Sequence, residues 1–138
     1  MPVIDFHCDT IYEIHHGQRE QNLYENDLKV DILKLQKSDV MAQVFALFFD
    51  LEEAKKQSKA PLQYAYEMKQ TFDHQLSEYS SYICKAHNYE DIIQNNKENK
   101  ISALLSVEEG GVHEGKLKNL QTIYEWGVRL LTLTWNYP

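Results

Sequence analysis

Val3-Ile4-Asp5-Phe6-His7-Cys8-Asp9-Thr10 is a short apolar run that ends in polar residues. We predict a strand over residues 2–6, with mostly apolar side chains on both faces, as in a buried parallel strand. Side chains two residues apart in a strand share a face, so His7 and Asp9 would lie side by side. An imidazole and a carboxylate at a rigid strand end suit zinc or a similar divalent ion. The alternative is a surface strand end with solvated polar residues, because one His-x-Asp pair is a weak motif.

Length and composition favour a globular protein. The chain has 138 residues, of which 43% are hydrophobic and 12% aromatic, and it can bury a sizeable core. Its formal net charge of −7 gives no support for a nucleic-acid or membrane partner, because both require clustered Lys and Arg. Cys8 and Cys84 lie outside any CxxC pattern, which indicates a reducing compartment. No basic leader or membrane-spanning apolar run is found, so we expect a cytoplasmic protein.

Further strands and helices alternate along the chain. Apolar runs predict strands at residues 41–49, 101–107 and 128–134, while residues 83–86 are too few to assign. Apolar spacing of three and four, together with turn and capping signals, predicts helices at residues 31–35, 61–82, 89–94 and 117–124. This order implies right-handed crossovers and a parallel α/β sheet of about four strands.

Two polar segments are interpreted as surface features. Residues 18–28 are rich in Gln, Glu and Asn and are expected to form an exposed loop. The adjacent His15 and His16 could not easily share a metal on a helix, and we expect them to be solvated near the mouth of a site.

A second candidate ligand follows the third strand. Glu108 and Glu109 precede a Gly110-Gly111 pair, which we expect to let the backbone turn away and leave a carboxylate at the rim of the sheet. An ordinary acidic turn is the alternative. Functional residues of parallel sheets gather at the carboxyl ends of the strands, where His7, Asp9, Glu108 and Trp135 are all predicted to lie.

Three motifs in this order resemble the membrane (renal) dipeptidase family of zinc peptidases, within the amidohydrolase-like metal-dependent hydrolases. They occupy residues 4–10, 107–111 and 127–134, so the resemblance spans essentially the whole chain. It implies the N-terminal half of a (β/α)8 TIM barrel with two zinc ions at its mouth. A complete barrel needs about 250 residues, so residues 1–138 are expected to form a single incomplete domain.

The resemblance also implies roles for individual residues. His7 and Asp9 match the ligands of one zinc, and Glu108 matches the catalytic carboxylate that bridges both ions. We assign the bridge to Glu108 rather than Glu109, because the spacing to the next helix then needs no gap. Trp135 and Asn136 are expected to contact substrate. Trp135 stands where mammalian members have a histidine, which leaves substrate positioning open.

The implied activity is hydrolysis of dipeptides by a water shared between two zinc ions, which attacks the peptide carbonyl near neutral pH. A non-catalytic half-barrel and an amidohydrolase-type enzyme acting on a cyclic amide are the alternatives. The family's two remaining histidine ligands, an aspartate and an arginine are absent from residues 1–138. We therefore expect weak or single-metal binding and no appreciable turnover from this chain alone. Unpaired edge strands suggest association with another copy as a homo-oligomer.

Overall fold

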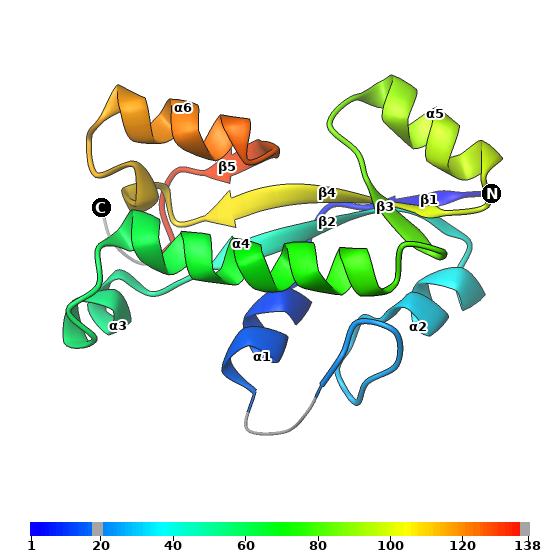
Figure 1. The fold of residues 1–138 in the computed structure, drawn as a ribbon, viewed down its shortest axis with the longest axis horizontal. Helices are drawn as coiled ribbons and strands as arrows, with labels where there is room; N and C mark the ends of the chain where they lie inside the picture. The colour runs from blue at the N-terminus through cyan, green and yellow to red at the C-terminus, as the bar shows by residue number, and fades with distance from the viewer. Residues whose placement is uncertain (18–20, 136–138) are drawn as a thin grey trace.

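A parallel sheet forms the centre of the structure (Figure 1). The computed structural model describes residues 1–17 and 21–135. Its strands are β1 (Val3–Asp5), β2 (Val40–Phe48), β3 (Ile83–Lys85), β4 (Ile101–Glu108) and β5 (Val128–Thr132). The order is β1-β2-β4-β3, with β5 also paired to β4, and every pair is parallel. The predicted α/β fold is therefore confirmed.

The strand β4 lies between β2 on one edge and both β3 and β5 on the other. Its first residues pair with β3, where Ile83 lies opposite Ile101. Its last residues pair with β5, up to Thr132 opposite Glu108. The four predicted strands are present, and the unassigned segment forms the three-residue β3.

Helices connect these strands. They are α1 (Thr10–His16), α2 (Ile32–Lys37), α3 (Leu51–Lys56), α4 (Pro61–Glu78), α5 (Tyr89–Lys97), the 3-10 helix η1 (Gly110–His113) and α6 (Leu117–Glu125). Pro61 occupies the first turn of α4, and the Asn88 side chain caps α5 by accepting from the Asp91 N–H. None of the described helices has the length and apolar character needed to cross a membrane.

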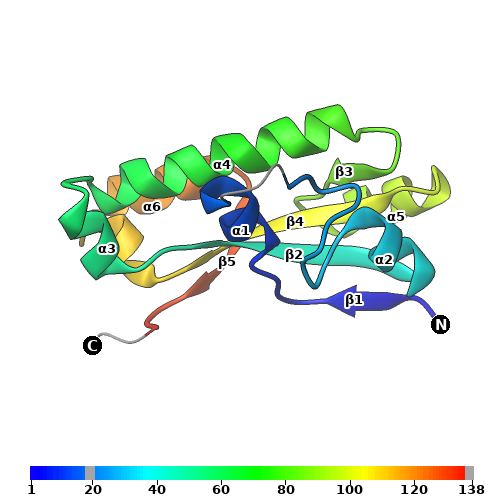
Figure 2. The ribbon, with the colours of Figure 1, turned by 90° about the horizontal axis from the view of Figure 1, so that it is seen from below.

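The core lies between the sheet and α4. Figure 2 shows α4 running alongside β2 and β4. Figure 1 shows α5 on the opposite side of β4 from α4, where Asn95 of α5 donates to Ser102 Oγ at 3.1 Å. The rings of Phe45 and Phe72 lie 5.7 Å apart, which joins β2 to α4. The buried residues on this face include Phe45, Leu47, Met68, Phe72, Leu105 and Val107. The strand residues that alternate with these point to the other face, namely Ala42, Val44, Ala46, Ser102, Leu104 and Ser106.

Two predictions about polar segments are wrong. His15 and His16 are half-buried against α4 rather than solvated: His15 Nδ1 lies 2.8 Å from Thr71 Oγ1, and His16 Nε2 lies 2.6 Å from Tyr64 Oη. Burial, aided by the neighbouring His16, lowers the pKa of His15. These contacts fix α1 against α4.

The segment expected to be an exposed loop at residues 18–28 is described from residue 21 onward, and it is partly buried. Leu23 is fully buried, and its N–H donates to Gln75 Oε1 of α4 at 2.6 Å. An apolar anchor therefore holds this polar segment onto the core, which its overall composition did not reveal.

Candidate metal centre

His7 and Asp9 lie on either side of Cys8, whose backbone is paired with β2. The Cys8 N–H donates to the Val44 carbonyl at 3.1 Å, and the Cys8 carbonyl accepts from the Ala46 N–H at 3.0 Å. The Cys8 side chain is buried in the core, and this burial raises the pKa of its thiol to about 12. Because side chains alternate along extended backbone, His7 and Asp9 point away from the core.

Glu108 is the last residue of β4, at the carboxyl end of the sheet. It pairs with Phe48 of β2 on one edge and with Thr132 of β5 on the other. Strands on both sides therefore fix its backbone. Burial and the charge of Asp9 raise the pKa of the Glu108 carboxyl, and the nearby His7 partly opposes them.

The structure brings His7, Asp9 and Glu108 together. His7 Nε2 lies 3.2 Å from Asp9 Oδ1 and 3.2 Å from Glu108 Oε2. One ligand atom from each residue lies within 4.8 Å of the others, and the described residues contain no other such group of three. Tetrahedral zinc, with bonds of about 2.0–2.1 Å, spaces its ligand atoms about 3.3 Å apart. The donor types and their spacing therefore fit a divalent metal ion.

Glu109 directly follows Glu108 in the sequence but is not part of this group of candidate ligands. It is 3% exposed, and its Oε1 accepts from the Gly111 N–H at 3.0 Å. The positive φ of this turn, 109°, falls on Glu109 rather than on a glycine. Gly110 is required because of a close approach rather than a positive φ: a Cβ at this position would lie 2.4 Å from the Leu133 carbonyl oxygen.

Trp135 lies beside the end of β2. Its ring centroid is 4.9 Å from that of Phe48, in an edge-on contact, and the residue is 41% exposed. Phe48 pairs with Glu108, so the indole lies at the same end of the sheet as the candidate ligands. Asn136 lies outside the described residues. Substrate binding by Trp135 and Asn136 remains a prediction.

A cavity of about 510 Å³ opens beside His7 and Asp9. Its other walls come from Cys8, Thr10 and Glu13 and from residues 27–30 of the loop between α1 and α2. Sequence reasoning did not single out residues 27–30, because residues 27 and 28 belong to the segment expected to form an exposed loop and residues 29 and 30 were given no role. The signal that marks them is a pair of apolar residues, Leu28 and Val30, within a polar stretch.

The parallel sheet and its helices define an α/β protein of the barrel class, and the candidate metal ligands lie at the carboxyl ends of its strands. The chain belongs to the membrane dipeptidase family, peptidase family M19, whose model matches residues 1–138. The predicted family resemblance is therefore confirmed. No curated protein matches the chain.

Solved structures show the same fold over part of a longer chain. A metallopeptidase from Rhodobacter sphaeroides, liganded with a phosphinate mimic of the dipeptide L-Ala-D-Ala, matches with a TM-score of 0.81 at 12% identity, covering 100% of this chain and 46% of that one. Dipeptidase AC, a metallopeptidase of family M19, matches with a TM-score of 0.80 at 15% identity, covering 100% and 44%.

The probable dipeptidase PvdM from Pseudomonas aeruginosa matches with a TM-score of 0.67 at 15% identity, covering 81% of this chain and 30% of that one. The chain thus spans less than half the length of each of these relatives. The predicted half-barrel fold is confirmed.

Proposed function

We propose that the complete protein containing this chain is a zinc-dependent dipeptidase, with dipeptides as its substrates. The observation that carries the proposal is the His7, Asp9 and Glu108 group, whose ligand atoms lie within 4.8 Å of one another at the carboxyl ends of neighbouring strands. Membership of the membrane dipeptidase family supports the same reaction class. Residues 1–138 supply one part of this site and form a single incomplete domain in this proposal.

The three residues have distinct roles in this proposal. His7 and Asp9 bind one zinc ion through an imidazole nitrogen and a carboxylate oxygen. Glu108 would be the carboxylate shared between that ion and a second, and its side chain is only 18% exposed, against 50% for Asp9. Zinc supplies an activated water and stabilises the charge that develops on the substrate carbonyl. A bound cation also offsets the repulsion between the two carboxylates, which otherwise helps to raise the pKa of Glu108.

Substrate contact is assigned to Trp135 and Asn136. Trp135 is exposed at the end of the sheet that carries the metal ligands, and its packing on Phe48 limits where the indole can move. A cytoplasmic location and a homo-oligomer stay predictions.

The test is to purify the complete protein, measure its metal content, and assay a panel of dipeptides that includes members with a D-residue at the carboxyl end. We expect bound zinc and dipeptide hydrolysis. His7→Ala and Glu108→Gln should each lower kcat/KM by about a hundredfold or more, because each removes a ligand. The matched changes His74→Ala and Glu90→Gln alter exposed residues of α4 and α5 and should leave activity unchanged.

Two results would contradict the proposal. A protein that takes up no metal under these conditions would favour a structural role for the three side chains. A metal-loaded protein that hydrolyses cyclic amides but no dipeptide would identify a different amidohydrolase-type activity.

A further inference from the structure

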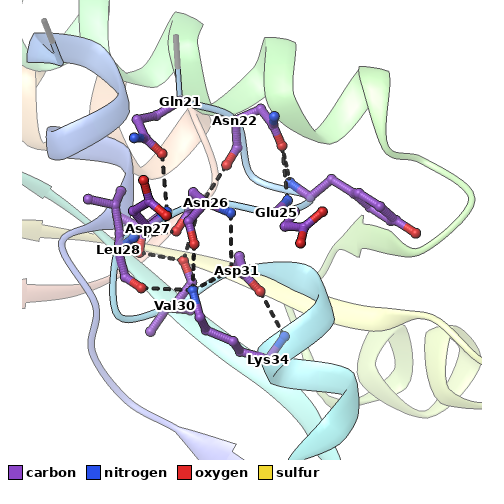
Figure 3. Close-up of polar contacts among 11 residues, drawn as sticks. Gln21, Asn22, Glu25, Asn26, Asp27, Leu28, Val30, Asp31 and Lys34 are labelled. Carbon is purple, nitrogen blue, oxygen red and sulfur yellow. Dashed lines mark hydrogen bonds and ion pairs between the residues drawn. The ribbon is translucent and has the colours of Figure 1, made fainter. Parts of the chain in front are cut away.

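The loop formed by residues 21–31, between α1 and α2, is held by a hydrogen-bond network (Figure 3). Asp31 is 1% exposed, and its carboxylate accepts from the backbone N–H groups of Asn26 and Lys34 and from Lys34 Nζ. Lys34 Nζ also donates to the carbonyls of Asn26, at 2.7 Å, and Leu28, at 2.8 Å. The ion pair between Lys34 and the buried Asp31 therefore organises the backbone of the loop.

Lys29 lies between two residues whose carbonyl groups are fixed. The Leu28 carbonyl accepts from Lys34 Nζ at 2.8 Å, and the Val30 carbonyl accepts from Thr10 Oγ1 at 3.2 Å. Thr10 directly follows the candidate metal ligands, so this second bond ties the loop to them. The Lys29 side chain itself is exposed and makes no hydrogen bond or ion pair with any described residue. Hydrogen bonds to the neighbouring carbonyls therefore hold its backbone, while its ammonium group can pair with a bound ligand.

Lys29 lines the same cavity as His7 and Asp9, and the volume of about 510 Å³ lies within the range of small-molecule sites. The other ionisable groups that line it include two further acids, Glu13 and Asp27. Among the described lining residues, Lys29 is the only one with a permanently cationic side chain. An anionic group entering the cavity is repelled by these carboxylates and attracted by Lys29.

We propose that Lys29 is a specificity-determining residue that binds a carboxylate of the substrate, an inference that rests on the proposed dipeptidase function. Every dipeptide carries a main-chain carboxylate, and Asp or Glu residues add a second one on a side chain. A lysine ammonium on a flexible stem can pair with either. Lys29 is not among the candidate metal ligands, so it acts on substrate affinity rather than on the reacting bond.

The experiment compares the complete wild-type protein with its Lys29→Met and Lys29→Arg variants. The probes are a dipeptide with two neutral side chains, the carboxyl-terminal amide of that dipeptide, and the corresponding dipeptide with one Glu side chain. We expect Lys29→Met to raise KM about tenfold with kcat nearly unchanged, and Lys29→Arg to retain affinity. The difference should shrink at high salt, because exposed charges are screened.

The three probes separate the two sources of the carboxylate. A loss for the neutral dipeptide, absent for its amide, identifies the main-chain group, whereas a loss confined to the Glu-containing dipeptide identifies the side chain. The control Lys37→Met removes the same charge from the exposed side of α2, outside the cavity, and should change neither constant.

An unchanged KM for all three probes in Lys29→Met, with hydrolysis intact, would overturn this inference and leave the proposed function standing. An absence of dipeptide hydrolysis in the wild-type protein would defeat both. Equal melting temperatures for wild type and Lys29→Met separate an effect on binding from an effect on folding.

Discussion

Glu108 and Glu109 are neighbouring acids with opposite surroundings. The Glu108 carboxylate is 3.2 Å from His7 Nε2 and remains partly open to solvent. The Glu109 carboxylate is buried and accepts from the Gly111 N–H, with the backbone in a positive-φ conformation. A divalent ion can therefore reach the first side chain, while the second shapes the turn that follows β4.

This contrast yields a prediction for a pair of isosteric changes. Glu108→Gln should lower the zinc affinity of the complete protein by about a hundredfold, because a neutral amide is a poor zinc ligand. Glu109→Gln should leave zinc binding nearly unchanged, because its amide oxygen can still accept from Gly111. Competition with a chelating dye measures both affinities. Equal losses in the two variants would contradict the separation of roles.

Among individual residues, the candidate metal ligands could be predicted from the sequence, whereas the residues that line the cavity could not. His7 and Asp9 follow from side-chain alternation within one short segment, and Glu108 follows from the rule that parallel strands end at one rim. Lys29 reaches the cavity through contacts such as the Thr10 to Val30 hydrogen bond, which joins residues 20 positions apart. No local pattern encodes that contact.

Among the elements, the loop of residues 21–31 depends on one buried carboxylate. Burial tends to raise the pKa of Asp31, but the hydrogen bonds from Lys34 and Asn26 and the charge of Lys34 outweigh it and hold this pKa below its usual value. A lowered carboxyl pKa stabilises the native state at pH values above the unfolded pKa of about 3.9, and this stabilisation is lost as the pH falls through the folded pKa.

Asp31→Asn should therefore loosen the loop at neutral pH. We expect hydrogen-exchange protection of the Asn26 and Lys34 amides to fall about tenfold or more at pH 7, because the variant loses the ion pair with Lys34. The difference from wild type should narrow as the pH falls below the unfolded pKa of about 3.9 and through the lower folded pKa, where the wild-type carboxylate also becomes protonated. Asp27→Asn, an exposed acid of the same loop, is the control. A difference that persists unchanged at pH 3 would refute this assignment.

The turn after β4 provides a second prediction about an element. Gly110→Ala would place a Cβ 2.4 Å from the Leu133 carbonyl oxygen, so η1 and the end of β4 must move apart from this backbone. We expect a loss of about 1–3 kcal/mol in unfolding free energy, together with weaker zinc binding, because Glu108 lies two residues earlier. Urea unfolding and zinc titration measure the two effects, with Lys118→Ala on the exposed side of α6 as the baseline. Wild-type behaviour in both would show that the turn adjusts without moving the site.

Element types could be predicted wherever an apolar pattern was long. The apolar runs at β2 and β4 and the helical spacing in α4 identify these elements without ambiguity. The three-residue β3 is too short to establish a period, and α3 has only two apolar residues, Leu51 and Ala54. Their absence from the prediction left the order of the principal strands unchanged.

For the molecule as a whole, the described sheet is open at its edges. In the described residues β1 pairs only with β2, and β5 pairs only with β4. The two solved metallopeptidases with the higher TM-scores are more than twice as long as this chain. The described residues contribute three candidate ligand side chains. Two zinc ions, each with about four ligands, need more protein ligands than three.

Residues 1–138 expressed alone should therefore separate metal binding from catalysis. We expect this chain to bind at most one zinc ion, weakly, because three side chains without their surrounding barrel leave the site open to water. It should show no measurable dipeptide turnover, since no second ion is held to share the charge of the transition state. Metal titration and a dipeptidase assay beside the complete protein test both statements, with Glu108→Gln in the short chain as the control for specific uptake. Zinc-dependent hydrolysis by the purified short chain, at a rate near that of the complete protein, would show that these residues form a sufficient site by themselves.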